Sequence, residues 1–298
     1  MMGLTNGEFT VQLNGINHWV KIEGSENETT PIVIIHGGPG GNHYVFERTA
    51  GHSLSKTRTI VYYEQRGCGR TEMPESENDY TIKLLIQDFV ELKKWLGAEK
   101  VDLLGYSFGG ELALEIAYAL PDEINQLILS APSLIDTDIQ KMIQITGFLT
   151  VADKHLYRQI SKLQQEGLSI DALYNRVWCL VDSSTVDLLL FENQEAARKN
   201  RVMWQESELT NTGLMMKSLQ NNPSKIPLIF RLEEIHHRTL IITGVFDRNT
   251  GLPISKIIHK NLRNSSLVLF EKSAHFPDLE EKEGFVKRIN EFLRAKLT

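Results

Sequence analysis

A serine between two glycines lies in the segment GYSFG at residues 105–109. An apolar run, KVDLLGYS (100–107), leads into it and a helical period follows, so the pattern lies where a strand ends and a helix begins. In this context Gly-x-Ser-x-Gly forms a nucleophile elbow, in which glycines permit a tight turn and the hydroxyl sits at a helix N-terminus that favours an anion. The pattern also occurs by chance, but the strand before it and the helix after it favour Ser107 as a nucleophile.

A serine hydroxyl needs a base to accept its proton, and the base needs a group that orients it. Asp247 ends the apolar run RTLIITGVFD (238–247), and His275 follows the run SLVLFE (266–271). Taken singly, an Asp after a strand is usually a turn residue and a loop His is usually solvated. Their order after Ser107 and their positions at strand ends predict a Ser-His-Asp triad.

The segment PIVIIHGGPGG (31–41) joins a buried strand to a loop of almost bare backbone. Acyl transfer creates an oxyanion that needs two backbone donors already in position. We expect these donors to be the N–H of Phe108, next to the nucleophile, and the N–H of Gly38 in this loop, with Pro39 stiffening the segment. A plain tight turn is the alternative. We expect His36 to brace the loop rather than to react.

The apolar runs predict the strands that would position these groups. Short runs without alternation are typical of parallel strands buried on both faces, and helical periods separate them. One helix should begin after Thr81 and end at Gly97. We expect a hairpin from 9–14 and 16–22, and further strands at 31–36, 58–64, 100–107, 126–131, 238–247 and 266–271.

From about residue 136 to residue 227 the strand signals stop and only amphipathic stretches remain. We name this segment the cap. The chain is therefore expected to form a mostly parallel α/β sheet with helices on both faces and a helical cap inserted before the last strands. The expected division is core at 1–135, cap at 136–227 and core again at 228–298.

The composition excludes several classes of protein. The 298 residues are 41% apolar with a net charge of −6, which is typical of a globular chain and provides no basic footprint for nucleic acid. We expect Cys68 and Cys179 to be reduced thiols, because they lie far apart and have no partners at metal-ligand spacing. No signal peptide or membrane span is apparent, so a cytoplasmic protein without membrane contact is expected. The chemistry requires no metal or other cofactor, and a homo-oligomer stays open.

With these residues in view, the chain resembles the α/β-hydrolase superfamily and, within it, the prolyl aminopeptidase (proline iminopeptidase) family. HGGPG (36–40) is that family's hallmark, and YYEQRGCGRT (62–71) resembles its D-Q-R-G-x-G-x-S segment, with Glu64 in place of the usual Asp. The resemblance implies Ser107 as nucleophile, His275 as base and Asp247 as its orienting group. It also implies a small-molecule or short-peptide substrate.

Peptidases of this family hold the substrate ammonium with carboxylates, mostly from the cap. The segment EAARKNRVMWQESEL (195–209) resembles the family's A-A-x-x-W-x-x-W-E stretch, but Gln205 directly follows Trp204, and Glu206 comes one place later. Arg248 follows the catalytic Asp, where some relatives carry a Glu. Trp204, Glu206 and Arg248 are therefore the expected substrate-binding residues. Alternatively, Arg248 points to solvent or pairs with a cap acid, and Glu206 lies on a solvated face.

Three functions compete. The leading hypothesis is an aminopeptidase that releases N-terminal residues such as proline through an acyl-enzyme at Ser107. The second is a cap-bearing carboxylesterase, lactonase or amidase that uses the same triad without requiring a free amine. The third is a non-catalytic α/β-hydrolase scaffold that serves as a binding protein, against which the complete triad and loop argue.

Overall fold

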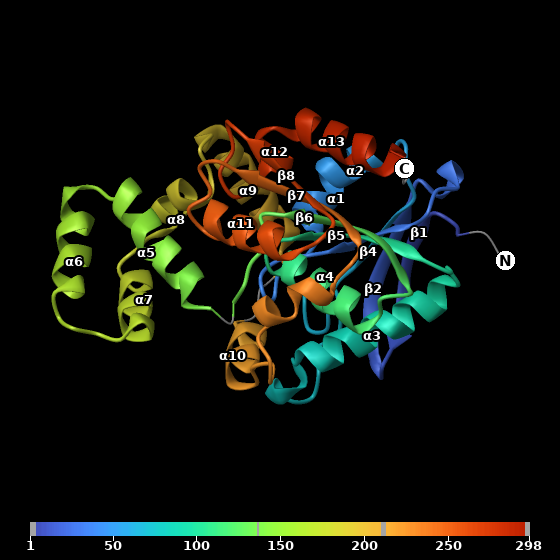
Figure 1. Ribbon diagram of the computed structural model, residues 1–298, viewed down its shortest axis with the longest axis horizontal. Coiled ribbons are helices and arrows are strands. Elements are labelled where there is room, and N and C mark those ends of the chain that lie inside the picture. Colours follow the sequence, from blue (N-terminus) through green and yellow to red (C-terminus); the bar gives the residue numbers. More distant parts are fainter. Residues whose placement is uncertain (1–3, 136, 210–212, 296–298) are drawn as a thin grey trace.

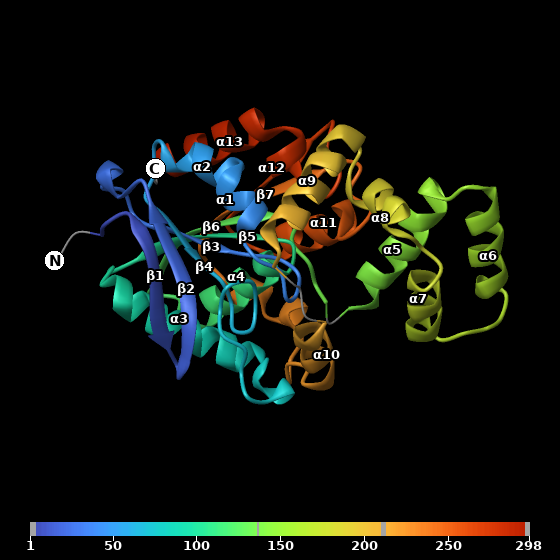
Figure 2. The same ribbon diagram turned by 180° about the vertical axis from the view of Figure 1, so that it is seen from behind.

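A computed structural model describes residues 4–135, 137–209 and 213–295. Its centre is an eight-stranded sheet in the order β1-β2-β4-β3-β5-β6-β7-β8 (Figures 1 and 2). The first two strands pair antiparallel with each other, and β2 also pairs antiparallel with β4; all later pairs are parallel. The strands are β1 Gly7–Leu13, β2 Ile16–Glu23, β3 Ile32–Ile35, β4 Ile60–Tyr63, β5 Val101–Tyr106, β6 Ile124–Ser130, β7 Arg238–Gly244 and β8 Ser265–Phe270.

The mostly parallel sheet and the terminal hairpin predicted from the apolar runs are confirmed. The helix predicted between Thr81 and Gly97 is confirmed as α3, and the Thr81 side chain accepts a hydrogen bond from the N–H of Leu84 at 3.2 Å. The helices are α1 Tyr44–Arg48, α2 Ala50–Ser55, α3 Ile82–Leu96, α4 Phe108–Ala119, α5 Asp138–Val151, α6 Lys154–Gln164, α7 Ile170–Trp178, α8 Ser183–Leu190, α9 Gln194–Ser207, α10 Leu214–Asn221, α11 Gly251–Asn261, α12 Pro277–Glu280 and α13 Lys282–Arg294.

Helices cover both faces of the sheet, because the central strands are apolar on both sides. In β3, Val33 and Ile35 belong to the apolar cluster that includes α3, α4 and α11, whereas Ile32 and Ile34 belong to the cluster that includes α1, α2 and α13. Alternate residues of a strand point to opposite faces, so each layer of helices buries its own half of the strand. Burial of this apolar area stabilises the packing of both helix layers against the sheet.

The cap lies between β6 and β7 and contributes helices α5 to α10. Residues of α5 to α8 form a separate apolar cluster around Phe148 and Ile160, and this part projects from the sheet (Figure 1). The last cap helix behaves differently, because Met215 and Leu219 of α10 belong to the main core cluster. Among the described residues, no helix is both long and apolar enough to cross a membrane.

Candidate active site

Ser107 occupies the sharp turn between β5 and α4. Its backbone angles are φ 55° and ψ −126°, a region that a residue with a side chain rarely adopts, and its N–H donates to Ser130 O at 2.9 Å. A Cβ at Gly109 would lie 2.0 Å from Ile35 O, and one at Gly105 would lie 2.1 Å from Gly109 O. The neighbouring backbone therefore excludes side chains at both glycines, and the serine takes the strained position between them.

The loop after β3, residues 36–41, lies directly against this turn, and we name it the oxyanion loop. A Cβ at Gly37 would come within 3.0 Å of the Ser107 Cβ, and Gly38 has a φ of +128°. Among the residues that the structure describes, the N–H groups of Gly38 and Phe108 donate no hydrogen bond. Both expected oxyanion donors are therefore free to bind a substrate oxygen.

His36 braces the oxyanion loop, as the sequence predicted. Its Nε2 accepts a hydrogen bond from the N–H of Gln65 at 3.0 Å, so Nδ1 carries the proton and donates to Gly37 O at 2.9 Å. Gln65 Nε2 also donates to His36 O at 2.9 Å. Burial lowers the pKa of His36, although its hydrogen bond to Gly37 opposes this effect, and the ring stays neutral.

The segment that carries Gln65 is itself held by a buried carboxylate. Glu64 accepts hydrogen bonds from Arg70 Nη2 at 2.6 Å and from the N–H of His43 at 3.1 Å. A Cβ at Gly69 would lie 2.3 Å from this carboxylate. Glu64, which replaces the Asp of the resembled segment, thus joins the YYEQRGCGRT segment to the residues after the oxyanion loop.

Asp247 and His275 lie on the loops after β7 and β8, which we name the acid loop (245–250) and the base loop (271–276). His275 Nδ1 is 3.2 Å from Asp247 Oδ2 and 3.3 Å from Oδ1. The carboxylate also accepts from the N–H of Asn249 at 2.8 Å and from Thr250 Oγ1 at 2.8 Å. Burial alone would raise the pKa of Asp247, but His275 and these donors outweigh it and lower the pKa. Asp247 is therefore an anion that can orient an imidazole.

The other imidazole nitrogen of His275 meets a residue that the sequence did not indicate. Asn249 Nδ2 is 3.0 Å from His275 Nε2, whereas Ser107 Oγ makes no hydrogen bond within the described ranges. The only sequence signal for Asn249 is its position two residues after Asp247. Nearby, burial raises the pKa of Asp278 to about 7, with His275 opposing the shift.

Two of the expected substrate-binding residues, Trp204 and Glu206, lie in the cap, and the third, Arg248, lies in the acid loop. Arg248 Nη2 is 2.7 Å from Glu192 Oε2, which agrees with the alternative that Arg248 pairs with a cap acid. Trp204 is half-buried and Glu206 is exposed, and both lie near the C-terminal end of α9. This helix packs against α1, which begins shortly after the oxyanion loop (Figure 2). The structure thus leaves the Glu206 carboxylate accessible and neutralises the Arg248 guanidinium.

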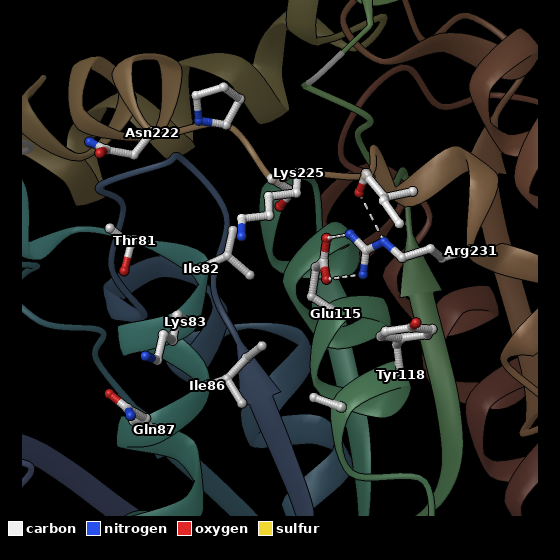
Figure 3. A pocket seen from close by; sticks show the side chains of 14 residues that line it. Thr81, Ile82, Lys83, Ile86, Gln87, Glu115, Tyr118, Asn222, Lys225 and Arg231 are labelled. Atoms are coloured by element: carbon white, nitrogen blue, oxygen red, sulfur yellow. Dashed lines mark hydrogen bonds and ion pairs between the residues drawn. The ribbon is translucent and has the colours of Figure 1, made fainter.

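A large cavity lies elsewhere, between α3, α4 and the segment that returns from the cap (Figure 3). Its volume is about 650 Å³, and none of the residues that line it belongs to the triad or the oxyanion loop. Arg231 and Glu115 form an ion pair at 2.5 Å on one side of it. The remainder of its lining is mostly apolar, from Ile82, Ile86 and neighbouring side chains. This cavity therefore lies outside the candidate active site.

Comparison with known proteins agrees with the fold. The profile of the alpha/beta hydrolase fold family matches residues 30–282, so the chain belongs to this family and is a hydrolase. Along almost its whole length it is similar to curated proline iminopeptidases. A proline iminopeptidase of Saccharolobus solfataricus is 28% identical over 94% of this chain and 89% of the relative. One of Clostridioides difficile is 27% identical over 99% of both chains.

Solved structures extend the likeness of fold. A proline iminopeptidase-related protein from Thermus thermophilus has a TM-score of 0.79 at 19% identity, with 97% of this chain and 98% of that chain covered. A meta-cleavage product hydrolase from Pseudomonas fluorescens has a TM-score of 0.70 at 21% identity, with 96% and 97% covered. At these identities the neighbours show the shared α/β-hydrolase fold.

Proposed function

We propose that the protein is a prolyl aminopeptidase that releases N-terminal residues, proline among them, through an acyl-enzyme at Ser107. The observation that carries the proposal is the Asp247–His275 pair, 3.2 Å apart, at the same edge of the sheet as the Ser107 turn. Near-full-length likeness to proline iminopeptidases supports the choice of substrate.

In this proposal Ser107 Oγ attacks the scissile carbonyl carbon while its proton passes to His275 Nε2. The carbonyl oxygen becomes an oxyanion, which the N–H groups of Gly38 and Phe108 receive. The imidazolium then gives its proton to the leaving amine as the carbon–nitrogen bond breaks. A water molecule, deprotonated by the same imidazole, attacks the acyl-enzyme; the bond between the acyl carbon and Ser107 Oγ breaks, the imidazolium returns the proton to Oγ, and the N-terminal residue is released. Asp247 orients the ring and stabilises its positive charge throughout.

The free ammonium of the substrate requires a negative partner. We assign this role to Glu206, whose carboxylate is exposed on α9, with Trp204 nearby on the same helix as an apolar wall. The Arg248–Glu192 pair keeps the guanidinium from repelling an ammonium. A second function, an esterase, lactonase or amidase with the same triad, is favoured by one departure: Gln205 stands directly after Trp204, where the resembled stretch has a Glu.

A substrate panel tests the proposal. Purified protein would be assayed on prolyl and alanyl amides with free amines, on the same amides with blocked amines, and on short p-nitrophenyl esters. An aminopeptidase is expected to have its highest kcat/KM on the free amides. If blocked amides or esters are turned over equally well or better, the second function replaces it.

A further inference from the structure

A chain of side-chain hydrogen bonds runs from the cap to the imidazole of His275. Trp178 Nε1, at the end of α7, lies 3.0 Å from Gln144 Oε1 on α5. Gln144 Nε2 lies 2.7 Å from Asn249 Oδ1 in the acid loop. Asn249 Nδ2 then lies 3.0 Å from His275 Nε2. Three successive bonds thus join two cap helices to the nitrogen that the proposed mechanism uses as a base.

Trp178 fixes which group donates and which accepts in each of these three hydrogen bonds. An indole Nε1–H only donates, so the amide oxygen of Gln144 must face Trp178 and its NH₂ must face Asn249. The oxygen of Asn249 must accept, which turns the NH₂ of Asn249 toward His275. His275 Nε2 is therefore an acceptor without a proton, and its Nδ1–H donates to Asp247.

A neutral imidazole has one lone pair at its unprotonated nitrogen, so it accepts one strong hydrogen bond there. Ser107 needs that lone pair to lose its proton, and in the structure Asn249 occupies it. Once His275 takes a proton, Nε2 becomes a donor and can no longer accept from the Asn249 NH₂. Trp178 prevents the Gln144 and Asn249 amides from simply reversing, because its indole cannot accept.

We propose that Asn249 is a positioning residue that holds the accepting nitrogen of His275 away from Ser107 in the resting enzyme. Gln144 and Trp178 of the cap orient the Asn249 amide group toward His275. The Asn249–His275 bond must break before Ser107 is activated. Movement of α5 relative to the acid loop withdraws Gln144 and releases the amide. The cap thereby controls the base as well as the substrate. This inference rests on the proposed triad.

Other contacts join the cap to the base loop, to α12 and to the acid loop. The N–H of His275 donates to Leu190 O at 3.0 Å, and Glu280 Oε1 accepts from the N–H groups of Glu192 and Asn193 at 2.8 and 2.7 Å. Arg248 of the acid loop pairs with the same Glu192. Displacement of the cap therefore acts on both loops that carry the acid and the base.

The first experiment measures the rate at which a small fluorophosphonate labels Ser107, because such a probe is too small to require the cap. Asn249→Ala removes the competing donor and is expected to increase the second-order labelling rate roughly 2- to 10-fold, the range of one ordinary hydrogen bond. Trp178→Phe keeps an aromatic ring but loses the donor, and a smaller increase is expected. Gln164→Leu, exposed on α6, is the matched cap control and should not change the rate. An unchanged or slower rate in folded Asn249→Ala protein overturns the proposal.

The second experiment needs no reaction. In ¹⁵N-histidine-labelled Ser107→Ala protein, the His275 Nε2 resonance reports its hydrogen bond, and a His275→Asn spectrum identifies it. Adding Asn249→Ala should move this resonance toward that of a free acceptor, whereas adding Gln164→Leu should leave it in place. A resonance that does not move with Asn249→Ala contradicts the inference. If Ser107 is never labelled while the resonance does move, the proposed function fails and the Asn249 contact stands.

Discussion

His275 and Asp247, 28 residues apart in the chain, meet with Nδ1 3.2 Å from Oδ2 at the ends of the neighbouring strands β7 and β8. Parallel neighbours end at the same edge of a sheet, so the loops that follow them meet there, and ligands of open α/β sheets bind at that edge. Ser107 follows β5 at the same edge. The topology thus brings the loops that carry the three residues of the proposed triad to one edge of the sheet.

Replacement of Ser107 by Ala is expected to remove nearly all hydrolysis of any substrate that the panel identifies, because the nucleophile is lost and the side-chain change is small. His275→Ala should be nearly as damaging, and the double variant little worse than either, since a triad acts as a unit. Initial rates with the best substrate measure this. A folded Ser107→Ala protein that keeps more than ~5% of wild-type turnover would contradict the mechanism.

A side chain at Gly38 should reduce the rate more than substrate binding. A Cβ there would lie 2.5 Å from the backbone nitrogens of Gly40 and Gly41, so Gly38→Val must displace the oxyanion loop. Loss of one oxyanion donor predicts a decrease of ~10²–10³ in kcat with a small change in KM. Gly167→Val, at a surface turn where nothing lies within 4 Å of the added Cβ, is the control for a bulky residue at a positive φ. Turnover within about threefold of wild type would exclude Gly38 from the oxyanion hole.

Removal of the Glu206 charge should distinguish amine substrates from neutral esters. If the carboxylate receives the ammonium, Glu206→Gln is expected to reduce kcat/KM on free prolyl amide roughly 10- to 100-fold and to leave p-nitrophenyl esters almost unchanged. Glu195→Gln, at the other end of α9, is the matched control. Equal losses on both classes of substrate would mean that charge recognition is not located at Glu206.

The stability of the protein should fall as the pH rises through the range in which Asp278 ionises. Burial raises the pKa of this carboxyl to about 7, whereas an unfolded Asp titrates near ~3.9. The folded protein therefore binds the proton more tightly than the unfolded chain. The stabilisation that this proton contributes is fully present below pH ~3.9 and is lost as the pH rises through about 7. Asp278→Asn cannot ionise and should be more stable than wild type at about pH 8, with a smaller difference at about pH 5.

Urea unfolding at both pH values measures the effect of Asp278→Asn. Burial also raises the pKa of Asp102, to about 6, so a residual pH dependence of the same sign is expected in the variant. Asp138→Asn, whose side chain is 59% exposed, is the control and should not alter the pH dependence. If the stability of wild type and of Asp278→Asn changed with pH in parallel, Asp278 would not be the responsible group.

The Arg231–Glu115 pair beside the cavity of Figure 3 should contribute to stability without affecting chemistry. Both terminal guanidinium nitrogens of Arg231, Nη1 and Nη2, donate to the carboxylate, at 2.8 and 2.5 Å, and both side chains are nearly buried. Arg231→Met leaves a buried carboxylate unpaired, with an expected loss of about 3–5 kcal/mol in the free energy of unfolding. The double variant Arg231→Met/Glu115→Leu should regain much of this loss in urea titrations. A single variant as stable as wild type would refute the expectation, and Lys199→Met in an exposed pair is the control.

The sequence by itself determined where the strands lie along the chain, where α3 begins and ends, and which residues are candidates for the triad, because these depend on local patterns. Thr81 and Gly97 delimit α3 through bonds within one helical turn, and the glycines around Ser107 reflect a turn only five residues long. Apolar runs predict buried strands, and parallel strands bring their following loops to one edge. The proposed acid and base could therefore be chosen from their positions at strand ends.

Only the tertiary structure decided how the cap meets the core. An amphipathic helix shows which of its faces is buried but not what covers that face, so the sequence could not separate α10, which packs on the core, from α5 to α8, which form their own cluster. Gln144 and Asn249 are 105 residues apart, and their hydrogen bond exists only because α5 docks on the acid loop. The segment between α8 and α9 likewise meets the acid loop, where Glu192 pairs with Arg248 across 56 residues. Such contacts follow from the relative placement of whole elements, for which neither residue carries a local signal.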